Sequence, residues 1–322
     1  MLACGLDRVG GPEVLTVREV PEPIIQPEML RVDVAIAGVN FQDTYYRSGI
    51  YPAPLPLILG DEGMGRVLET APGVCGFDVG DRVAWTGGQA GYAQRATVPV
   101  RMAARLPDDL PDEAGLLLAQ GLTAHYLAHD AAHVPRGGAA LVHAAAGGVG
   151  SLLTRVLHIR GVRVIGMVSS EGKIEAAFRA GADEVIVHGG AGFADTVRAM
   201  TGGHGVDVVF DGVGQPTFIE GIRSLRRRGS MVLYGAAGGK LESLNPHVLA
   251  TAGSITLIRP QLKDYLATRA EFEARVADLF AWMRRGQIEV QIGGRFALSE
   301  ACLAHRRLES RQTTGKLILL TQ

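Results

Sequence analysis

The hydrophobic and polar residues follow two different patterns along the chain. In residues 1 to about 120, short stretches such as RVDVAIAGVN (31–40) alternate apolar and polar positions, and Gly and Pro residues separate them. Because successive side chains of a strand point to opposite faces, this alternation predicts half-buried strands joined by turns. The stretch YPAPLPLILGDEGMG (51–65) contains several prolines and predicts a loop rather than a helix.

From about residue 120 onward, short apolar segments alternate with amphipathic ones. The apolar segments are AALVH (139–143), VRVIGMV (162–168), DEVIVH (183–188), VDVVFDGVG (206–214), SMVLYG (230–235) and SITLI (254–258). Amphipathic segments with helical spacing separate them, and the one after 206–214 is predicted to run to the end of LRRRG (225–229). Apolar strands that alternate with helices are typical of a parallel sheet covered by helices on both faces. Residues 121–260 are therefore predicted to form a doubly wound α/β domain.

The pattern changes again after residue 260. Residues 268–286 predict a long amphipathic helix, and GKLILL (315–320) predicts a final apolar strand. The apolar residues of that helix are Phe272, Val276, Leu279, Phe280 and Met283. We expect this segment to return to the first part of the chain, so that residues 1–120 and 261–322 form one β-rich domain.

Composition and charge exclude several classes of protein. The 322 residues include 32 Lys and Arg against 33 Asp and Glu, so the net charge of −1 gives no overall attraction to nucleic acid or anionic membranes. The three cysteines, Cys4, Cys75 and Cys302, lie far apart in the sequence and support neither a disulfide framework nor a cysteine zinc site. Without a signal-peptide pattern or an apolar run of about 18 residues, we expect a cytoplasmic protein.

A glycine-rich loop connects the strand at 139–143 to the following helix. AAAGGVG (144–150) matches the dinucleotide-binding pattern G-x-G-x-x-G, with Ala145 in place of the first glycine. Gly147, beside Gly148 and Val149, allows the backbone to approach a pyrophosphate, and Gly150 allows close packing of helix on strand. The N-terminus of the helix then presents free N–H groups to the anion. This arrangement predicts a Rossmann-type dinucleotide site.

The residue at the end of the next strand indicates which dinucleotide binds. NAD-binding proteins place an Asp or Glu there, about 20 residues beyond the glycines, to bind the ribose 2′-hydroxyl. This chain has Ser169, followed by Ser170 and Lys173, while Glu171 lies past the strand end. Hydroxyls and a lysine would accept a 2′-phosphate that a carboxylate would repel, so the sequence favours NADPH.

Several motifs together resemble the zinc-free medium-chain dehydrogenase/reductases of the NADPH:quinone oxidoreductase (zeta-crystallin) type. These motifs are GVNFQDTYYRSGIYP (38–52), GDRV (80–83), GLTAHY (121–126), HAAAGGVG (143–150), DGVG (211–214), RRGSMVLYG (227–235), TRAE (268–271) and LESRQTTGK (308–316). The resemblance covers the whole chain. It implies a GroES-like β-rich catalytic domain interrupted by a Rossmann domain, NADPH as cofactor, a quinone as substrate and a homodimer.

The resemblance also implies individual site residues. Asn40 through Tyr45 would line the pocket for the nicotinamide and the substrate, and Thr123 and Tyr126 would contact the cofactor. Ser169, Ser170, Lys173 and His188 would surround the adenosine phosphate, with Arg311 from the C-terminal segment. Val213, Gly235, Ala236 and Pro260 would line the nicotinamide side. His188 is a tolerable variant of a position that is often Tyr, although a water-exposed histidine at a strand end is an equal alternative.

Zinc-dependent relatives carry a cysteine and a histidine where this chain has Asn40 and Asp61, which are poor zinc ligands in that setting. His125, His129 and His133 are spaced four apart. They lack the glutamate of an HExxH motif, so we favour an exposed helical face over a metal site. The sequence therefore predicts an enzyme without metal.

Three tyrosines, Tyr45, Tyr46 and Tyr51, follow Asn40 closely. A tyrosine hydroxyl could hydrogen-bond a substrate carbonyl as charge develops on it. Asn40 and Tyr45 are the candidate catalytic residues, although Tyr45 is assigned equally to packing, and Tyr46 is assigned to packing. Asn40, Tyr45 and Tyr51 are the candidate substrate-binding residues.

Two other functions remain open from the sequence. A 2-enal or enoyl-thioester reductase would share the same cofactor site. A role in RNA binding or as a structural, crystallin-like protein is weaker, because LRRRG (225–229) is the single dense basic run and no aromatic residues interleave with it.

Overall fold

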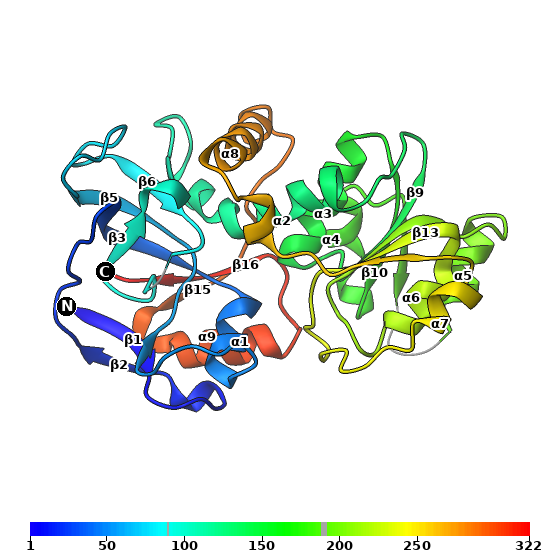
Figure 1. The fold of residues 1–322 in the computed structure, drawn as a ribbon, viewed down its shortest axis with the longest axis horizontal. Helices are drawn as coiled ribbons and strands as arrows, with labels where there is room; N and C mark the ends of the chain where they lie inside the picture. The colour runs from blue at the N-terminus through cyan, green and yellow to red at the C-terminus, as the bar shows by residue number, and fades with distance from the viewer. Residues whose placement is uncertain (89, 188–191) are drawn as a thin grey trace. The chain divides into compact units, whose positions relative to one another are not determined.

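The computed structural model describes residues 1–88, 90–187 and 192–322 (Figure 1). The described chain forms two compact units: Met1–Leu122 together with Leu266–Gln322, and Thr123–Tyr265. The boundaries lie a few residues from those expected from the change of pattern. No helix of the described residues is long and apolar enough to cross a membrane.

The second unit is built on a six-stranded parallel sheet. Its strands are β9 (Ala139–His143), β10 (Arg163–Val168), β11 (Glu184–Val187), β12 (Val206–Asp211), β13 (Leu225–Leu233) and β14 (Thr256–Ile258). Their spatial order is β11-β10-β9-β12-β13-β14. From β9 the chain runs outward through β10 and β11, and then returns to β12 on the other side. This reversal creates the switch point beside which doubly wound sheets bind ligands, at the carboxyl ends of the strands.

Helices connect these strands, as the alternating pattern predicts. They are α3 (Gly148–Ile159), α4 (Ile174–Arg179), α5 (Phe193–Met200), α6 (Phe218–Ser224) and α7 (His247–Thr251). The helices α3 and α4 contact one another, as do α5 and α6, and the two pairs cover opposite faces of the sheet (Figure 1). The helix α4 ends before Gly181, whose φ of +100° suits the residue after a helix end.

The prediction of a helix through LRRRG (225–229) is wrong. The helix α6 ends at Ser224, and the arginines belong to β13. Leu225 pairs with Val206 and Ser230 with Val208, so the residues between Leu225 and Ser230 bulge out of the ladder. Arg226 Nε lies 2.6 Å from Asp207 Oδ1. Burial of Leu225 in the sheet therefore overrides the helical pattern of this segment.

The first unit contains a small antiparallel sheet and a larger mixed sheet. The smaller has the order β2-β1-β4, and the larger has the order β15-β16-β3-β5-β6-β8, with β7 also paired to β3. These strands are β1 (Leu2–Leu6), β2 (Thr16–Glu19), β3 (Met29–Val39), β4 (Leu57–Ile58), β5 (Gly63–Thr70), β6 (Arg82–Trp85), β7 (Arg95–Pro99), β8 (Ala103–Arg105), β15 (Ile292–Ala297) and β16 (Lys316–Leu320). The antiparallel pairing of β16 with β3 returns the end of the chain to its beginning, as expected.

Among the described residues of the first unit, four α-helices begin, and one of them is missed by the sequence pattern. They are α1 (Phe41–Ser48), α2 (Leu118–Tyr126), α8 (Arg269–Arg284) and α9 (Ala301–Glu309). Residues 41–48 were expected among strands and turns, but they form α1. The helix begins because the Asp43 carboxylate accepts the Asn40 backbone N–H at 2.8 Å, and it ends at Gly49, whose φ is +82°. An Asn-x-x-Asp spacing was therefore a helix signal in the sequence.

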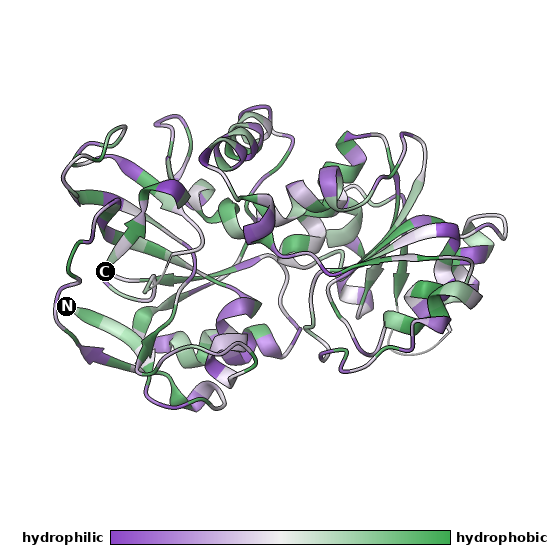
Figure 2. Cartoon of the chain, viewed as in Figure 1, coloured by the Kyte–Doolittle hydropathy of each residue, from purple (hydrophilic) through white to green (hydrophobic). Residues whose placement is uncertain are grey.

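The predicted helix at 268–286 is confirmed as α8. Thr268 and Glu271 form a reciprocal capping box at its start. Phe272, Val276, Leu279 and Phe280 are buried along one face, and Figure 2 shows hydrophilic and hydrophobic residues side by side around this helix. Short helical turns complete the chain at Pro12–Val14, Val100–Met102, Asp112–Leu117, Leu127–Ala131, Glu171–Lys173, Leu262–Tyr265 and Leu298–Glu300.

Candidate active site

The loop between β9 and α3 leaves no room for a side chain at Gly150. A Cβ on Gly150 would collide with the carbonyl oxygen of Ala144, so α3 packs against the loop only with glycine there. Gly147 precedes the helix, and Gly147, Gly148 and Val149 are half-buried. The first N–H groups of a helix have no partner within it, so this end of α3 can receive an anion.

After the end of β10, the ammonium group of Lys173 contacts the hydroxyl of Ser169. Lys173 Nζ donates to Ser169 Oγ at 3.3 Å, and Ser169 and Ser170 are exposed. Partial burial lowers the pKa of Lys173. The expected phosphate-binding residues thus lie together at the strand end, and Glu171 is exposed beside them. His188, the fourth residue of this predicted group, lies outside the described residues.

The remaining predicted cofactor residues of this unit follow the carboxyl ends of neighbouring strands. Val213 comes two residues after β12, Gly235 and Ala236 follow β13, and Pro260 follows β14. A Cβ on Gly235 would lie 2.5 Å from the carbonyl oxygen of Gly212, so the two loops touch through their backbones. A dinucleotide lying across the switch point would meet this edge of the sheet, so these residues fit NADPH.

A buried carboxylate that the sequence analysis missed orders the loop after β12. Asp211 accepts the backbone N–H groups of Val213 at 2.7 Å and Gly214 at 3.0 Å, and the Thr217 hydroxyl at 2.8 Å. His143 Nδ1, at the end of β9, lies 3.0 Å from its Oδ1. Burial acts to raise the pKa of Asp211, but His143 and the hydrogen bonds outweigh it and lower that pKa. The motifs DGVG and HAAAGGVG contain these two residues, and only the fold shows that they meet.

The residues predicted on α2 are placed differently from one another. Thr123 is half-buried, whereas Tyr126 is 2% exposed and stacks on Tyr265 with ring centroids 4.2 Å apart. Since Tyr265 covers its ring, Tyr126 offers a ligand little surface as it stands.

The expectation of an exposed histidine face is wrong for one histidine. His125 is buried and stacks on the exposed ring of His129 at 4.3 Å, because the chain continues after α2 in a wide helical turn. His133 follows the end of that turn. Across the described parts of the chain, no three His, Cys, Asp or Glu residues are grouped as a metal site requires.

In the first unit, the three tyrosines form one aromatic group. The Tyr51 ring meets Tyr45 edge-on at 5.3 Å and Tyr46 at 5.5 Å. Burial, followed by the nearby charge of Asp61, raises the pKa of Tyr46. Tyr46 also packs against the core of this unit, which agrees with a packing role.

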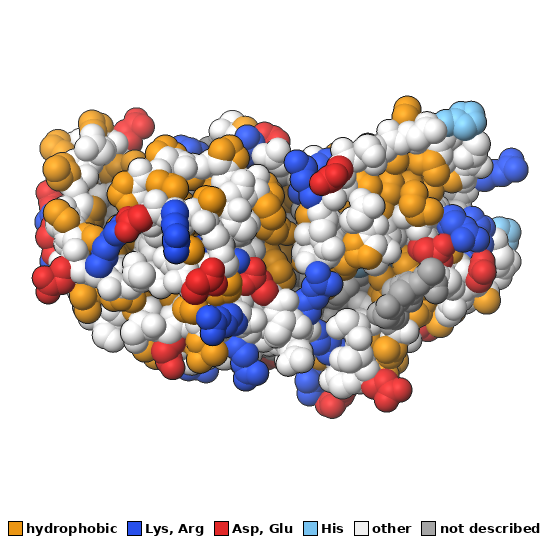
Figure 3. All heavy atoms as spheres, turned by 90° about the horizontal axis from the view of Figure 1, so that it is seen from below, with side chains coloured by type: hydrophobic (Ala, Val, Ile, Leu, Met, Phe, Trp, Pro, Cys, Tyr) orange, Lys and Arg blue, Asp and Glu red, His pale blue; other side chains and the backbone are white. Residues whose placement is uncertain are grey.

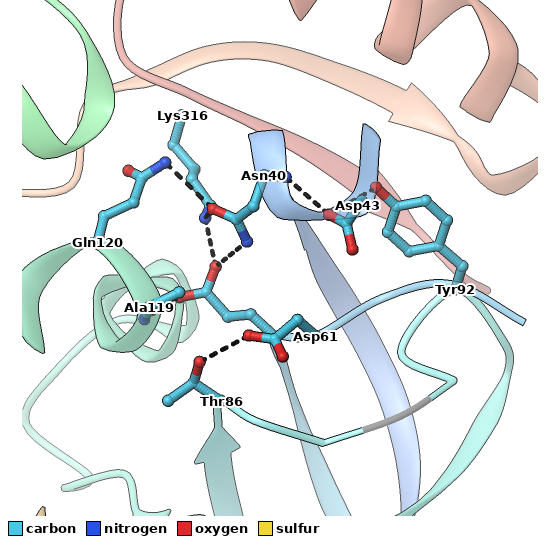
Figure 4. A network of polar contacts seen from close by, with 9 residues as sticks. Asn40, Asp43, Asp61, Thr86, Tyr92, Ala119, Gln120 and Lys316 are labelled. Carbon is cyan, nitrogen blue, oxygen red and sulfur yellow. Dashed lines mark hydrogen bonds and ion pairs between the residues drawn. The ribbon is translucent and has the colours of Figure 1, made fainter. Parts of the chain in front are cut away.

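The Asn40 side chain lies at the centre of a polar network (Figure 4). Its Oδ1 accepts from Lys316 Nζ at 2.8 Å and from Gln120 Nε2 at 3.3 Å, while its Nδ2 donates to Glu62 Oε2 at 3.2 Å. Lys316 and Glu62 form an ion pair, with side chains 2% and 0% exposed. Neither residue is recognisable from the sequence, since neither a lone Lys nor a lone Glu marks a buried pair.

A second chain of hydrogen bonds links two residues of α1, Arg47 and Asp43, through His305 and Tyr92. Arg47 Nη1 lies 3.1 Å from His305 Nδ1, and His305 Nε2 lies 3.1 Å from the Tyr92 hydroxyl. Arginine can only donate, so the neutral ring carries its proton on Nε2 and donates to Tyr92. The Tyr92 hydroxyl then donates to Asp43 Oδ2 at 3.2 Å. Burial, and then the charge of Arg47, lower the pKa of His305 to about 3, which keeps this direction at neutral pH.

The two positions at which zinc-dependent relatives carry metal ligands, Asn40 and Asp61, do not fit a metal ion here. Asp61 accepts from Gln42 Nε2 at 3.1 Å and Thr86 Oγ1 at 3.0 Å, and burial raises the pKa of its carboxyl. The carbonyl oxygen of the Asn40 side chain is engaged by Lys316 and Gln120. A lysine ammonium beside the same oxygen opposes binding of a second cation.

Arg311, predicted to reach the adenosine phosphate, lies on the segment between α9 and β16. It is exposed and has a φ of +56°.

Comparisons with known proteins agree with both units. The alcohol dehydrogenase GroES-like domain matches residues 26–136, and the zinc-binding dehydrogenase family matches residues 148–282. A quinone oxidoreductase of Pseudomonas aeruginosa is 39% identical over 314 residues, which cover 97% of each chain. A 2-haloacrylate reductase of a Burkholderia species is 36% identical and covers 100% of this chain and 99% of its own.

A solved mycobacterial protein, complexed with NADPH, has a TM-score of 0.97 and 42% identity over 99% of this chain and 100% of its own. The sheet topology, the glycine loop on α3 and these full-length similarities agree with the resemblance seen in the sequence motifs. The chain belongs to the quinone oxidoreductase family of the medium-chain dehydrogenase/reductases, with a GroES-like domain and an inserted Rossmann domain.

Proposed function

We propose that the protein transfers reducing equivalents from NADPH to a quinone without a metal ion. The observation that carries this proposal is the contact of Lys173 with Ser169 at the end of β10, where NAD-binding proteins have an acid. A lysine and two exposed serines at this point suit a 2′-phosphate, and the NADPH-bound relative supports that cofactor.

The cofactor would lie along the carboxyl edge of the parallel sheet. Gly147, Gly148, Val149 and Gly150 would receive its pyrophosphate at the start of α3. Ser169, Ser170, Lys173 and His188 would hold the adenosine phosphate, with Arg311. Thr123 would contact the cofactor from α2, and Tyr126 would do so only where its ring is not covered by Tyr265. Val213, Gly235, Ala236 and Pro260 would line its nicotinamide. When bound, NADPH supplies a hydride.

Asn40, Tyr45 and Tyr51 would contact the substrate in the first unit. Their part is to orient the acceptor and to donate hydrogen bonds to its carbonyl oxygen as negative charge develops there. A quinone is a strong acceptor, so orientation and one or two such donors can suffice without a Lewis acid.

Reduction of a carbon–carbon double bond conjugated to a carbonyl is the second candidate. The similarity to a 2-haloacrylate reductase favours it, since that name describes a conjugated acceptor. The same residues would serve both reactions, because the oxygen of either acceptor gains charge.

Binding of RNA has little support. Arg226 of the basic run pairs with Asp207. On the face drawn in Figure 3, Lys and Arg side chains are interspersed with Asp and Glu. A homodimer and a cytoplasmic location remain predictions from the sequence.

The test combines a cofactor variant with a panel of acceptors. We expect NADPH, and far less NADH, to be oxidised by a quinone faster than by an enal, a haloacrylate or an enoyl thioester. Lys173→Glu should lower NADPH affinity by a factor of about 10–100, because a charge-assisted contact is lost and repulsion is added, while NADH affinity barely changes.

Arg179→Glu, at an exposed residue of the neighbouring α4, is the matched charge-reversal control. Equal losses for both cofactors in Lys173→Glu would contradict contact of Lys173 with the 2′-phosphate. Faster turnover of the enal or the thioester than of every quinone would replace the quinone by the second candidate. Separation of semiquinone from hydroquinone in the product distinguishes one-electron from two-electron transfer.

A further inference from the structure

The orientation of the Asn40 amide is determined by the chemistry of its neighbours. Lysine carries only donors, so the atom that Lys316 Nζ contacts at 2.8 Å must be the amide oxygen. The amide nitrogen then faces the Glu62 carboxylate, to which it donates at 3.2 Å. A half-turn of the amide would place its NH2 group against an ammonium and its oxygen against a carboxylate. The ion pair therefore permits one orientation.

This orientation leaves one donor unused. The amide nitrogen has two N–H groups, and one of them is occupied by Glu62. Within the described residues no hydrogen bond is formed by the other, and Asn40 is only half-buried. Its neighbours Lys316 and Glu62 are almost completely buried. A rigid amide thus presents a single N–H group at the start of α1, the helix that carries Tyr45.

The surrounding chain is built to hold this ion pair. A Cβ on Gly38 of β3 would lie 2.8 Å from Lys316 Cε and would collide with Glu62 Oε2. The other oxygen of Glu62 accepts the backbone N–H of Ala119, at the start of α2, at 2.7 Å. Burial of two charges is costly, and a buried pair is weak evidence for added stability. A role in fixing the Asn40 amide accounts for the Lys316–Glu62 pair better than a gain in stability does.

We propose that Lys316 is a positioning residue which, with Glu62, fixes the Asn40 amide so that its second N–H group donates to the carbonyl oxygen of the substrate. This inference rests on the proposed reduction of a quinone or conjugated carbonyl. The charged donor on the amide oxygen also polarises the amide, which strengthens the outward N–H group as a donor. Lys316 thereby makes the Asn40 N–H group that faces the substrate oxygen more positive.

The test is a mutant cycle that separates catalysis from stability. Lys316→Met with Glu62→Gln removes both charges together, so that no unpaired charge remains buried. We expect kcat to fall on the order of tenfold, a fraction of what loss of a complete oxyanion donor costs, with NADPH affinity unchanged. Asn40→Ala should lose at least as much. In the Asn40→Ala background the same double change should no longer lower kcat, yet it should shift the unfolding temperature as before.

Arg82→Met is the matched control, since Arg82 forms a partly buried ion pair with Asp112 in the same unit, outside this network. It should lower the unfolding temperature and leave kcat unchanged. Equal loss of kcat from the double change in both backgrounds, or no loss in either, would overturn the inference.

A second measurement does not need turnover. The side-chain amide signal of Asn40, assigned by its loss in Asn40→Ala, should show two distinct protons with slow hydrogen exchange, and this protection should disappear in the double variant. Retained protection would also refute the positioning role. A wild-type protein that transfers hydride from NADPH to none of the tested quinones or conjugated carbonyls, but keeps this amide protection, would refute the proposed function and leave the amide orientation standing.

Discussion

At the scale of single residues, the chemistry depends on a few polar atoms whose neighbours fix their direction. The end of β10 carries Ser169 and Lys173 in contact, and the start of α1 carries Asn40 between Lys316 and Glu62. The first pair could be predicted from the sequence because its residues are four apart in a known position of a common fold. The second could not, because Lys316 and Glu62 are separated by most of the chain.

The clearest residue prediction concerns Tyr45. Its ring is half-buried and meets Tyr51 edge-on, which is compatible with packing and with donation to a substrate. If the hydroxyl stabilises developing charge, Tyr45→Phe keeps the ring and removes one donor, which is worth about 3 kcal/mol or roughly a hundredfold in turnover. The loss should grow as the acceptor becomes weaker, so kcat is measured with a strong quinone and with an enal.

Tyr45→Ala is the companion variant. It removes the ring as well and should raise KM for every acceptor by opening the site. Turnover of Tyr45→Phe close to that of the wild type on the enal would leave Tyr45 as a wall of the site with no catalytic part.

At the scale of elements, α1 shows where the hydrophobic pattern is insufficient. The helix has only eight residues and buries the polar side chains of Asp43, Thr44 and Arg47. Its cap and its bonds to Tyr92 and His305 replace the apolar stripe from which helices are usually predicted. The parallel strands of the second unit were predictable for the opposite reason, since nearly continuous apolar segments leave little choice of structure. LRRRG was mispredicted because the pairing of Leu225 with Val206 depends on a strand elsewhere in the chain.

Asp43 gives a pH-dependent prediction for this element. Burial raises the pKa of its carboxyl to about 7, and the charge of Asp61 adds to this, while the Asn40 N–H, Lys316 and Tyr92 oppose it. Between about pH 4 and pH 7 the folded protein holds a proton that the unfolded chain has lost, so this group's contribution to stability falls as pH rises through that window. Above pH 7 both states are ionised and the contribution is constant.

The measurement is the unfolding temperature of the wild type and of Asp43→Asn from pH 4.5 to pH 8.5. The amide that replaces the carboxyl in this variant does not titrate, so the advantage of the wild type over the variant should shrink as pH rises toward 7 and then stay level. Groups that do not interact with Asp43 titrate alike in both proteins and cancel in the difference. Curves that remain parallel throughout would contradict a raised pKa at Asp43.

At the scale of the whole molecule, the architecture was predictable and the supporting polar networks were not. The change of pattern near residues 120 and 260 indicated an α/β unit inserted in a β-rich one, and the pairing of β16 with β3 brings the last strand back to the first part. Sequence periodicity describes how each segment is buried. It carries no information on which distant polar side chains meet, so Asp211 with His143, and His305 with Tyr92, become visible only in the folded chain.

The last prediction concerns the whole protein: its activity should not depend on zinc. Residues 148–282 match a family described as zinc-binding dehydrogenases. Whether this chain binds zinc therefore depends on the residues at the ligand positions. Asn40 and Asp61 are engaged in hydrogen bonds, and the Lys316 ammonium contacts the Asn40 oxygen that a metal would need. Prolonged dialysis against a chelator should leave kcat with NADPH and a quinone unchanged, and added zinc should not increase it. Elemental analysis of the same samples supplies the control, because stoichiometric zinc that is lost and restored in step with activity would show that a metal site exists in spite of these contacts.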